Sequence, residues 1–263
     1  MLAPPVNGMA EVWWNFFETA LLLLVRISGL MVFAPPFSSD AIPVRIKIGL
    51  TLVLTIVIAP IAAASKRPLS MGVEAILGEL AVGLLLGILL TFLQEAVTFA
   101  GYLLNLEFSF SLVNVLDPGS KVETPLMGQL ASLILLLVLF TGGLYRVVVE
   151  AMLRTLVAVP AGQARFDAFV SPAILSMFGG ILLAGIQLAS PVIAATFLVQ
   201  VTTALVGKLS PSLPVMIVGI PLKTLTGYVV LTASLGLWPR FIDGRFSALL
   251  DAAMQLLEHH LKA

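Results

Sequence analysis

Long apolar stretches dominate the pattern along this chain. Residues 126–145 contain no Asp, Glu, Lys or Arg, and neither do residues 174–206. A helix rises about 1.5 Å per residue, so about 20 apolar residues cross the roughly 30 Å hydrocarbon layer of a bilayer. The first stretch has the length of one membrane-spanning helix and the second exceeds it. The pattern therefore predicts an integral-membrane type of protein.

Glycine and proline interrupt the longer stretch. Gly179, Gly180, Gly185 and Pro191 all lie within residues 174–206. Such residues bend or break helices in membrane proteins. The stretch is thus either one tilted, kinked helix or two helices that meet at a bend.

Hydropathy predicts about six apolar segments in all. They are continuous, whereas membrane strands would alternate in runs of about 10 residues. Prolines punctuate the connections and disfavour helix at the residue before them. We therefore predict an all-α, integral-membrane-type helical protein, whose apolar segments are residues 12–34, 48–64, 73–104, 126–145, 173–206 and 213–237.

The C-terminal tail has a different pattern. After Pro239, apolar residues such as Phe246, Leu249 and Leu250 alternate with charged residues such as Arg245 and Asp251. This periodicity is typical of an amphipathic helix. Residues 241–261 are expected to dock on an apolar surface or to lie at an interface.

Composition narrows the possible functions. Hydrophobic residues make up 59% of the chain and charged residues 11%, against about 25% charged in an ordinary soluble domain. Lipid or partner subunits must cover the surface, and a net charge of zero gives no reason to expect nucleic-acid binding. There is no Cys, and His259 and His260 lie in the polar tail. Because no catalytic or metal-binding motif can be assembled, we expect no enzyme, metal site or cofactor.

A few charges lie within or at the ends of the apolar segments, where a charge at mid-membrane costs about 2.5–3.5 kcal/mol on insertion scales. Either they form a polar track for ions or protons, or they pair, across subunits or outside the hydrocarbon layer. The second interpretation is favoured, because the two longest uncharged stretches contain no acid of the kind that a proton-coupled transporter needs. These intramembrane or interface charges are Glu18, Arg26, Glu79, Glu95 and Lys223.

Small residues recur along the third segment. Gly78, Gly83 and Gly87 include a Gly-x-x-x-Gly spacing, which allows two helices to approach closely. The spacing fits close packing within the chain and a seam between subunits equally well. These glycines are candidate helix-packing positions.

Four groups of motifs are spread over nearly the whole chain. They are Arg26-x-Ser28-Gly29 with Pro35-x-Phe37 and Ile42-Pro43-x-Arg45-x-Lys47; residues 74–87; Gly101 and Phe108-Ser109 with Asp117-Pro118-Gly119, Phe140-x-Gly142-Gly143 and Pro160; and Ala189-Ser190-Pro191 with Gly207-Lys208-x-x-Pro211 and Gly219-Ile220-Pro221-x-Lys223-x-x-x-Gly227. Together they resemble the FliR family of flagellar type III protein-export gate components, whose virulence-system counterparts form the SctT group. Leu144 and Tyr145 depart from a family His, Lys208 from a family Arg, and Ser212 and Pro214 from a polar pair.

The resemblance implies one FliR-like domain over residues 1–263, with a FliP-like part at about 1–170, a FliQ-like part at about 171–240 and the tail at 241–263. It implies helices broken into hairpins that stack on FliP-like and FliQ-like subunits and associate with FlhB-like and FlhA-like components. Other subunits would then cover much of the apolar surface, and membrane lipid the rest.

The resemblance also suggests a pore plug in the third segment and the loop after it. The alternative is a plain loop whose phenylalanines dock on the chain's own core. Phe108 and Phe110 are large enough to fill a narrow pore. The plug candidates are Asn105, Leu106, Glu107, Phe108, Ser109 and Phe110.

The resulting hypothesis is a non-enzymatic structural and gating subunit of a flagellar export gate. It would contribute to a channel for unfolded flagellar substrates in the basal body, at the bacterial inner membrane. The alternatives are an SctT-type virulence component, a transporter that works alone and, least favoured, a membrane-embedded enzyme.

Overall fold

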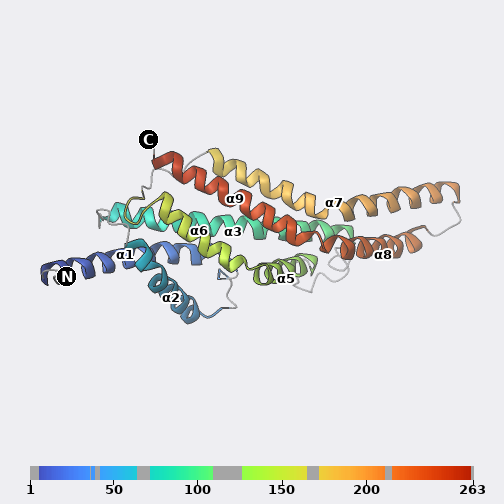
Figure 1. Cartoon of the computed structure of the whole chain (residues 1–263). Coiled ribbons are helices and arrows are strands. Elements are labelled where there is room, and N and C mark those ends of the chain that lie inside the picture. The colour runs from blue at the N-terminus through green and yellow to red at the C-terminus, as the bar shows by residue number, and fades with distance from the viewer. Residues whose placement is uncertain are drawn as a thin grey trace. The chain divides into compact units, whose positions relative to one another are not determined.

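The computed structural model describes residues 6–35, 37–38, 42–63, 72–108, 126–164, 172–210 and 215–261, without the side chains of residues 6–11, 144–148, 172–178, 215–216 and 256–261. Within these ranges the regular elements are all α-helices (Figure 1). The helices are α1 Val6–Phe33, α2 Val44–Ala63, α3 Val73–Glu107, α5 Leu126–Thr141, α6 Leu144–Ala158, α7 Pro172–Leu209, α8 Val215–Leu235 and α9 Trp238–Leu261.

The predicted all-α, membrane-type architecture is confirmed. Five of the described helices are long and apolar enough to cross a membrane, and α5 is a shorter apolar helix. Prolines mark several boundaries: α2 begins directly after Pro43, and Pro172 is the first residue of α7. The first position of a helix tolerates proline because its N–H has no intrahelical partner there.

The long uncharged stretch forms one continuous helix. α7 runs from Pro172 to Leu209 with Pro191 inside it, and Figure 1 shows it bent along its length. An internal proline removes one backbone hydrogen bond and clashes with the preceding turn, which bends the helix. Of the two interpretations, the single kinked helix is the one observed. The reversal of direction occurs between α7 and α8 instead, so these two helices form the hairpin.

Hydropathy did not predict α6 as a separate helix. After α5 ends, Gly143 adopts a left-handed conformation with φ of 72°, and α6 starts at the next residue. Glycine reaches this conformation without the steric cost that a Cβ imposes. α6 carries Arg146, Glu150 and Arg154 at four-residue spacing, which gives it one polar face and keeps it below a hydropathy threshold. That spacing, between a Gly-Gly pair and a proline, is the signal that could have identified the helix.

The C-terminal helix docks on the chain itself. Ile242, Phe246, Leu250 and Ala253 of α9 are buried. Phe246, Leu249 and Leu250 line a small apolar cavity together with residues from α1, α3 and α6, namely Leu30, Leu86, Leu89, Leu90 and Ala151. The amphipathic helix predicted for the tail is therefore present, and its apolar face is covered.

The chain divides into two compact units, each made of discontinuous segments. Unit 1 comprises Met1–Phe92, Gly143–Ser176 and Phe246–Ala263, and unit 2 comprises Leu93–Gly142 and Met177–Arg245. α1, α2 and α6 belong to unit 1, whereas α5 and α8 belong to unit 2. The division into a FliP-like and a FliQ-like part near residue 170 concerns a likeness to other subunits and stays a prediction.

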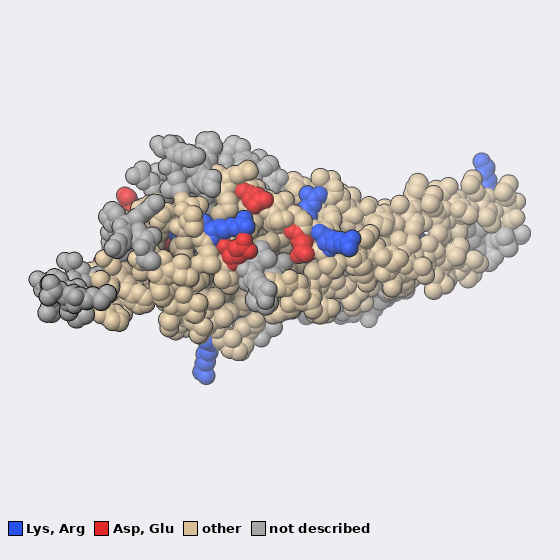
Figure 2. All heavy atoms as spheres, in the orientation of Figure 1, with Lys and Arg blue, Asp and Glu red and all other residues tan. Residues whose placement is uncertain are grey.

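The helices differ sharply in how far the chain buries them. In the most apolar stretch of α3, 67% of the residues are buried, against 22% in α2 and 17% in α8. Uncharged residues cover most of the face in Figure 2, and charged side chains are few on it. Much apolar surface on α2 and α8 is thus left for lipid or another protein to cover.

Candidate functional site

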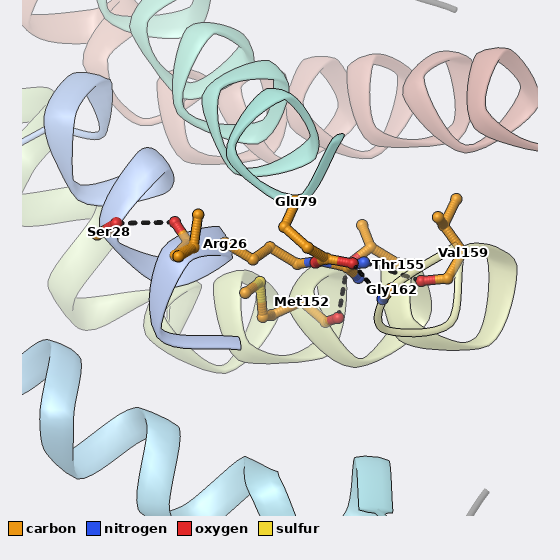
Figure 3. Close-up of polar contacts among 8 residues, drawn as sticks. Arg26, Ser28, Glu79, Met152, Thr155, Val159 and Gly162 are labelled. Carbon is orange, nitrogen blue, oxygen red and sulfur yellow. Dashed lines mark hydrogen bonds and ion pairs between the residues drawn. The ribbon is translucent and has the colours of Figure 1, made fainter. Parts of the chain in front are cut away.

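Unit 1 contains a fully buried polar cluster around Arg26, called here the Arg26 cluster and made of Arg26, Glu79, Thr155, Val159 and Gly162 (Figure 3). Arg26 Nε donates to Glu79 Oε2 at 2.5 Å, and the two side chains are 0% exposed. Arg26 Nη1 donates to Thr155 Oγ1 at 3.3 Å and Nη2 donates to the Val159 carbonyl oxygen at 2.9 Å. The guanidinium therefore joins α1 to α3 and α6.

Glu79 uses its second oxygen as well. The backbone N–H of Gly162 donates to Glu79 Oε1 at 2.8 Å. Gly162 adopts a left-handed conformation with φ of 80°, which turns the chain after α6 so that this N–H meets the carboxylate. The Thr155 hydroxyl in turn donates to the Met152 carbonyl oxygen at 2.7 Å. Each charged group of the Arg26 cluster thus has more than one partner.

Close helix packing brings this cluster together. A Cβ atom added at Gly83 would lie 2.0 Å from the Arg26 carbonyl oxygen, and one at Gly87 would lie 2.8 Å from the Leu30 carbonyl oxygen. A Cβ at Gly78 would lie 2.0 Å from the Ala164 carbonyl oxygen. α1 and α3 therefore approach each other backbone to backbone, within one chain.

Burial determines how much folding stability the loss of the Arg26–Glu79 pair would cost. Two charges removed from water require partners for every remaining donor and acceptor, and breaking a buried pair typically costs about 3–5 kcal/mol. The sequence placed Arg26 and Glu79 among the charges that need partners, but they are 53 residues apart, so no local spacing revealed the pairing. The Arg26 cluster fixes three segments of unit 1.

Unit 2 contains a second, less buried charged pair at the end of α3. Lys223 Nζ of α8 lies 3.0 Å from Glu107 Oε2, with side chains 15% and 24% exposed. The buried Thr196 hydroxyl of α7 donates to the same carboxylate oxygen at 2.8 Å. Glu107 is the last residue of α3. The sequence singled out both Lys223 and Glu107, for different reasons, and the structure joins them.

An aromatic contact lies beside this pair. Phe108 is buried and its ring stacks on Tyr228 of α8, with centroids 4.7 Å apart and planes at 18°. A Cβ at Gly227 would lie 2.2 Å from Phe108 Cε1, so the glycine makes room for the ring. The buried Oδ1 of Asn105, one turn earlier, has no hydrogen-bond partner among the described residues. We call Glu107, Phe108, Thr196, Lys223, Gly227 and Tyr228 the α3-end cluster.

The remaining predicted positions are more scattered. Glu18 is half-buried on α1 and Glu95 is exposed on α3; neither forms an ion pair with another described residue. Leu106 is exposed, whereas Ser109 and Phe110 lie outside the described residues. Of the six plug candidates, four therefore belong to the C-terminal end of α3 or directly follow it.

The described residues contain no group of three or more His, Cys, Asp or Glu side chains that could hold a metal ion. The geometry instead provides one buried polar cluster, one half-buried pair and long apolar helices. Comparison with known proteins gives this arrangement its context. The model of the bacterial export proteins, family 1, matches residues 17–249.

This chain belongs to that family. It is similar to the flagellar biosynthetic protein FliR of Escherichia coli (strain K12), with 25% identity across 94% of this chain and 96% of the relative. FliR of Bacillus subtilis (strain 168) is 25% identical across 92% and 96% of the two chains. The Yop proteins translocation protein T of Yersinia pestis is 27% identical across 78% and 81%.

Membership of bacterial export protein family 1 sets the broad role. The chain is a component of a secretion apparatus and associates with other components of it. Its long apolar helices place it in a membrane. The resemblance inferred from the motifs around Arg26, Glu79 and Lys223 is thereby confirmed at the level of the family.

Proposed function

We propose that this family member is a non-enzymatic structural and gating subunit of the flagellar type III export gate. It forms part of the wall of a channel that passes unfolded flagellar substrates at the bacterial inner membrane, within the flagellar basal body. The observation that carries this proposal is the apolar surface of α2 and α8. Few of their residues are buried within the chain, and membership of an export-protein family favours other subunits, beside lipid, as the cover for this surface.

The pairing of charges favours a subunit of a channel wall rather than an ion carrier. Arg26 and Glu79 neutralise each other inside unit 1, and Glu107 and Lys223 do so in unit 2. Ion carriers need acids that are open to a transport path. Three of the five charges that could have formed such a path, Arg26, Glu79 and Lys223, are instead committed to holding helices together.

Genetic complementation tests the proposal. In a flagellated host that lacks its own FliR, this chain should restore secretion of flagellar substrates and swimming. The host chain serves as the positive control and an empty vector as the negative control. A chain that accumulates in the membrane, co-purifies with host gate subunits and still supports no flagellar secretion contradicts the flagellar assignment.

The proposed partners are FliP-like and FliQ-like subunits together with FlhB-like and FlhA-like components. Exposed residues on α8, such as Ile217, Leu225 and Val229, form one surface that such subunits would cover. Co-expression followed by mild solubilisation and mass measurement should recover a complex of fixed composition. Recovery of the monomer alone in the presence of all partners counts against the assembly.

The plug proposal involves the end of α3. Residues 105–110, including Ser109 and Phe110, are proposed to close the channel of the assembled gate. The burial of Phe108 against Tyr228 attaches the segment to this chain, as the alternative of a loop that docks on the chain's own core also predicts for Phe108. Deletion of residues 106–110 should leave the assembled gate intact and make the membrane leak ions. An assembled deletion variant without a leak excludes the plug.

A virulence-system role is the second candidate, because the Yersinia translocation protein T covers 78% of this chain at 27% identity. Complementation of an injectisome mutant, but not of a flagellar one, would decide for it. Reconstitution distinguishes the gate subunit from a transporter that works alone. As a gate subunit, the purified chain should give no substrate flux in vesicles without its partners.

A further inference from the structure

The α3-end cluster attaches α3 to the α7–α8 hairpin at two neighbouring points. One is polar, where the Glu107 carboxylate meets Lys223 at 3.0 Å and Thr196 at 2.8 Å. The other is aromatic, where Phe108 stacks on Tyr228 and fills the space over Gly227. Lys223 and Gly227 are four residues apart on α8, so they lie on the same face of that helix. The same face of α8 thus contacts Glu107 and Phe108, the two consecutive residues at the end of α3.

The polar contact of Glu107 with Lys223 and Thr196 can separate without leaving an unsatisfied donor. The Thr196 hydroxyl has a single hydrogen but three acceptors within reach: Glu107 Oε2 at 2.8 Å, the Val192 carbonyl oxygen at 2.9 Å and the Ile193 carbonyl oxygen at 3.1 Å. If Glu107 moves away, the hydroxyl donates to its own helix and leaves no unsatisfied donor. Lys223 and Glu107 are both partly exposed, so their charged groups can be hydrated when they separate.

The attached state also contains an unsatisfied group. Asn105 is 6% exposed and its Oδ1 has no hydrogen-bond partner among the described residues. A buried acceptor without a partner is unfavourable. The end of α3 therefore carries a local cost beside the ion pair.

We propose that Lys223 is a positioning residue, which holds the end of α3 on the α7–α8 hairpin through Glu107 in the ion-tight state and releases it when a polypeptide passes. We call the pair of Glu107 and Lys223, with Thr196, the latch. The proposal rests on the proposed gate function and adds the element that controls it. The latch acts by placing α3, and neither charged group contacts a reacting atom.

The test uses the assembled gate in membranes and two measurements. The first is ion flux into vesicles. The second is a distance between spin labels on Leu106→Cys and Leu198→Cys. Both side chains are exposed, Leu198 lies on α7 outside the α8 surface proposed for partner subunits, and this chain has no Cys of its own. Lys223→Met should lengthen or broaden this distance and raise ion flux about two- to fivefold, the range expected for a partly exposed ion pair.

Rescue and a matched control separate positioning from general damage. Lys223→Arg keeps the charge and should leave both measurements at wild-type values. The exchange Glu107→Lys with Lys223→Glu should restore much of both. Arg154→Met removes one positive charge from the exposed Glu150–Arg154 pair of α6 and should change neither. A structural defect in folding would not be rescued by the exchange.

The outcomes decide as follows. Unchanged distance and flux in Lys223→Met overturn the latch, and so does a change in one measurement without the other, because positioning requires both. Deletion of residues 106–110 is measured alongside. If the deletion leaks and Lys223→Met does not, the latch is wrong and the proposed gate stands. If Lys223→Met lengthens the distance while the deletion stays ion-tight, the plug proposal fails and the latch fails with it as a gating element.

Discussion

The Arg26 cluster and the α3-end cluster are built from similar residues but differ in burial. Both centre on a carboxylate and a cation from different helices, with a threonine hydroxyl beside them. In the first, both side chains are fully buried and each has several partners. In the second, both are partly exposed. Burial makes the first expensive to break, whereas access to water makes the second reversible.

Gly83 and Gly227, one beside each cluster, show the same contrast. Gly83 faces the Arg26 carbonyl oxygen, which is backbone, while Gly227 faces the edge of the Phe108 ring, which is the end of a side chain. A backbone atom cannot yield without moving a helix, but a ring can rotate. Unit 1 is therefore built as a fixed scaffold, and the end of α3 in unit 2 as an adjustable attachment. A gate needs both properties.

The largest expected effect comes from breaking the Arg26 cluster. Arg26→Met leaves the Glu79 carboxylate buried with only the Gly162 N–H, so we expect a loss of about 3–5 kcal/mol in folding stability. The variant should fail to accumulate in membranes. The double variant Arg26→Met with Glu79→Met removes both charges and should recover part of the loss. Accumulation and thermal unfolding in detergent measure both, and equal stability of single and double variants contradicts the assignment.

The glycines provide a matched test of the same comparison. Gly83→Ala drives a Cβ to 2.0 Å from a backbone oxygen and should cost about 1–3 kcal/mol, as overpacking does. Gly227→Ala meets side chains rather than backbone, namely the Phe108 ring at 2.2 Å and Thr196 Cγ2 at 3.3 Å, and should cost less. Gly49→Ala on α2 meets nothing within 4 Å and should be neutral or slightly stabilising. Thermal unfolding of the three variants should give this order, and any other order removes the contrast between the two clusters.

The smallest effects distinguish the two threonines. Thr155→Val removes an acceptor from the buried Arg26 guanidinium, and we expect a cost of about 1.5–3 kcal/mol, typical of hydrogen bonds to charged groups. Thr196→Val leaves Glu107 paired with Lys223 and partly hydrated, so the cost should be about 0.5–1 kcal/mol. Both changes are close to isosteric. Equal shifts in the melting temperature would show that burial does not separate the two clusters.

Sequence patterns predicted much of the architecture. The apolar segments match α1, α2, α3, α5, α7 and α8, because a chain with 59% hydrophobic residues can satisfy its backbone in lipid only as long helices. The amphipathic pattern after Pro239 identified α9. α6 escaped because its charged face lowers its hydropathy. The motifs indicated the export family, which the match over residues 17–249 confirms.

The sequence by itself thus determined which segments are apolar helices, where prolines separate them, and that Arg26, Glu79 and Lys223 need partners. Only the tertiary structure decided which partners they have. Arg26 and Glu79 lie 53 residues apart, and Glu107 meets Lys223 across two different helices. Hydrophobicity is a property of each residue and can be summed along a chain, whereas pairing depends on the register and close approach of helices, which arise only when the whole set packs.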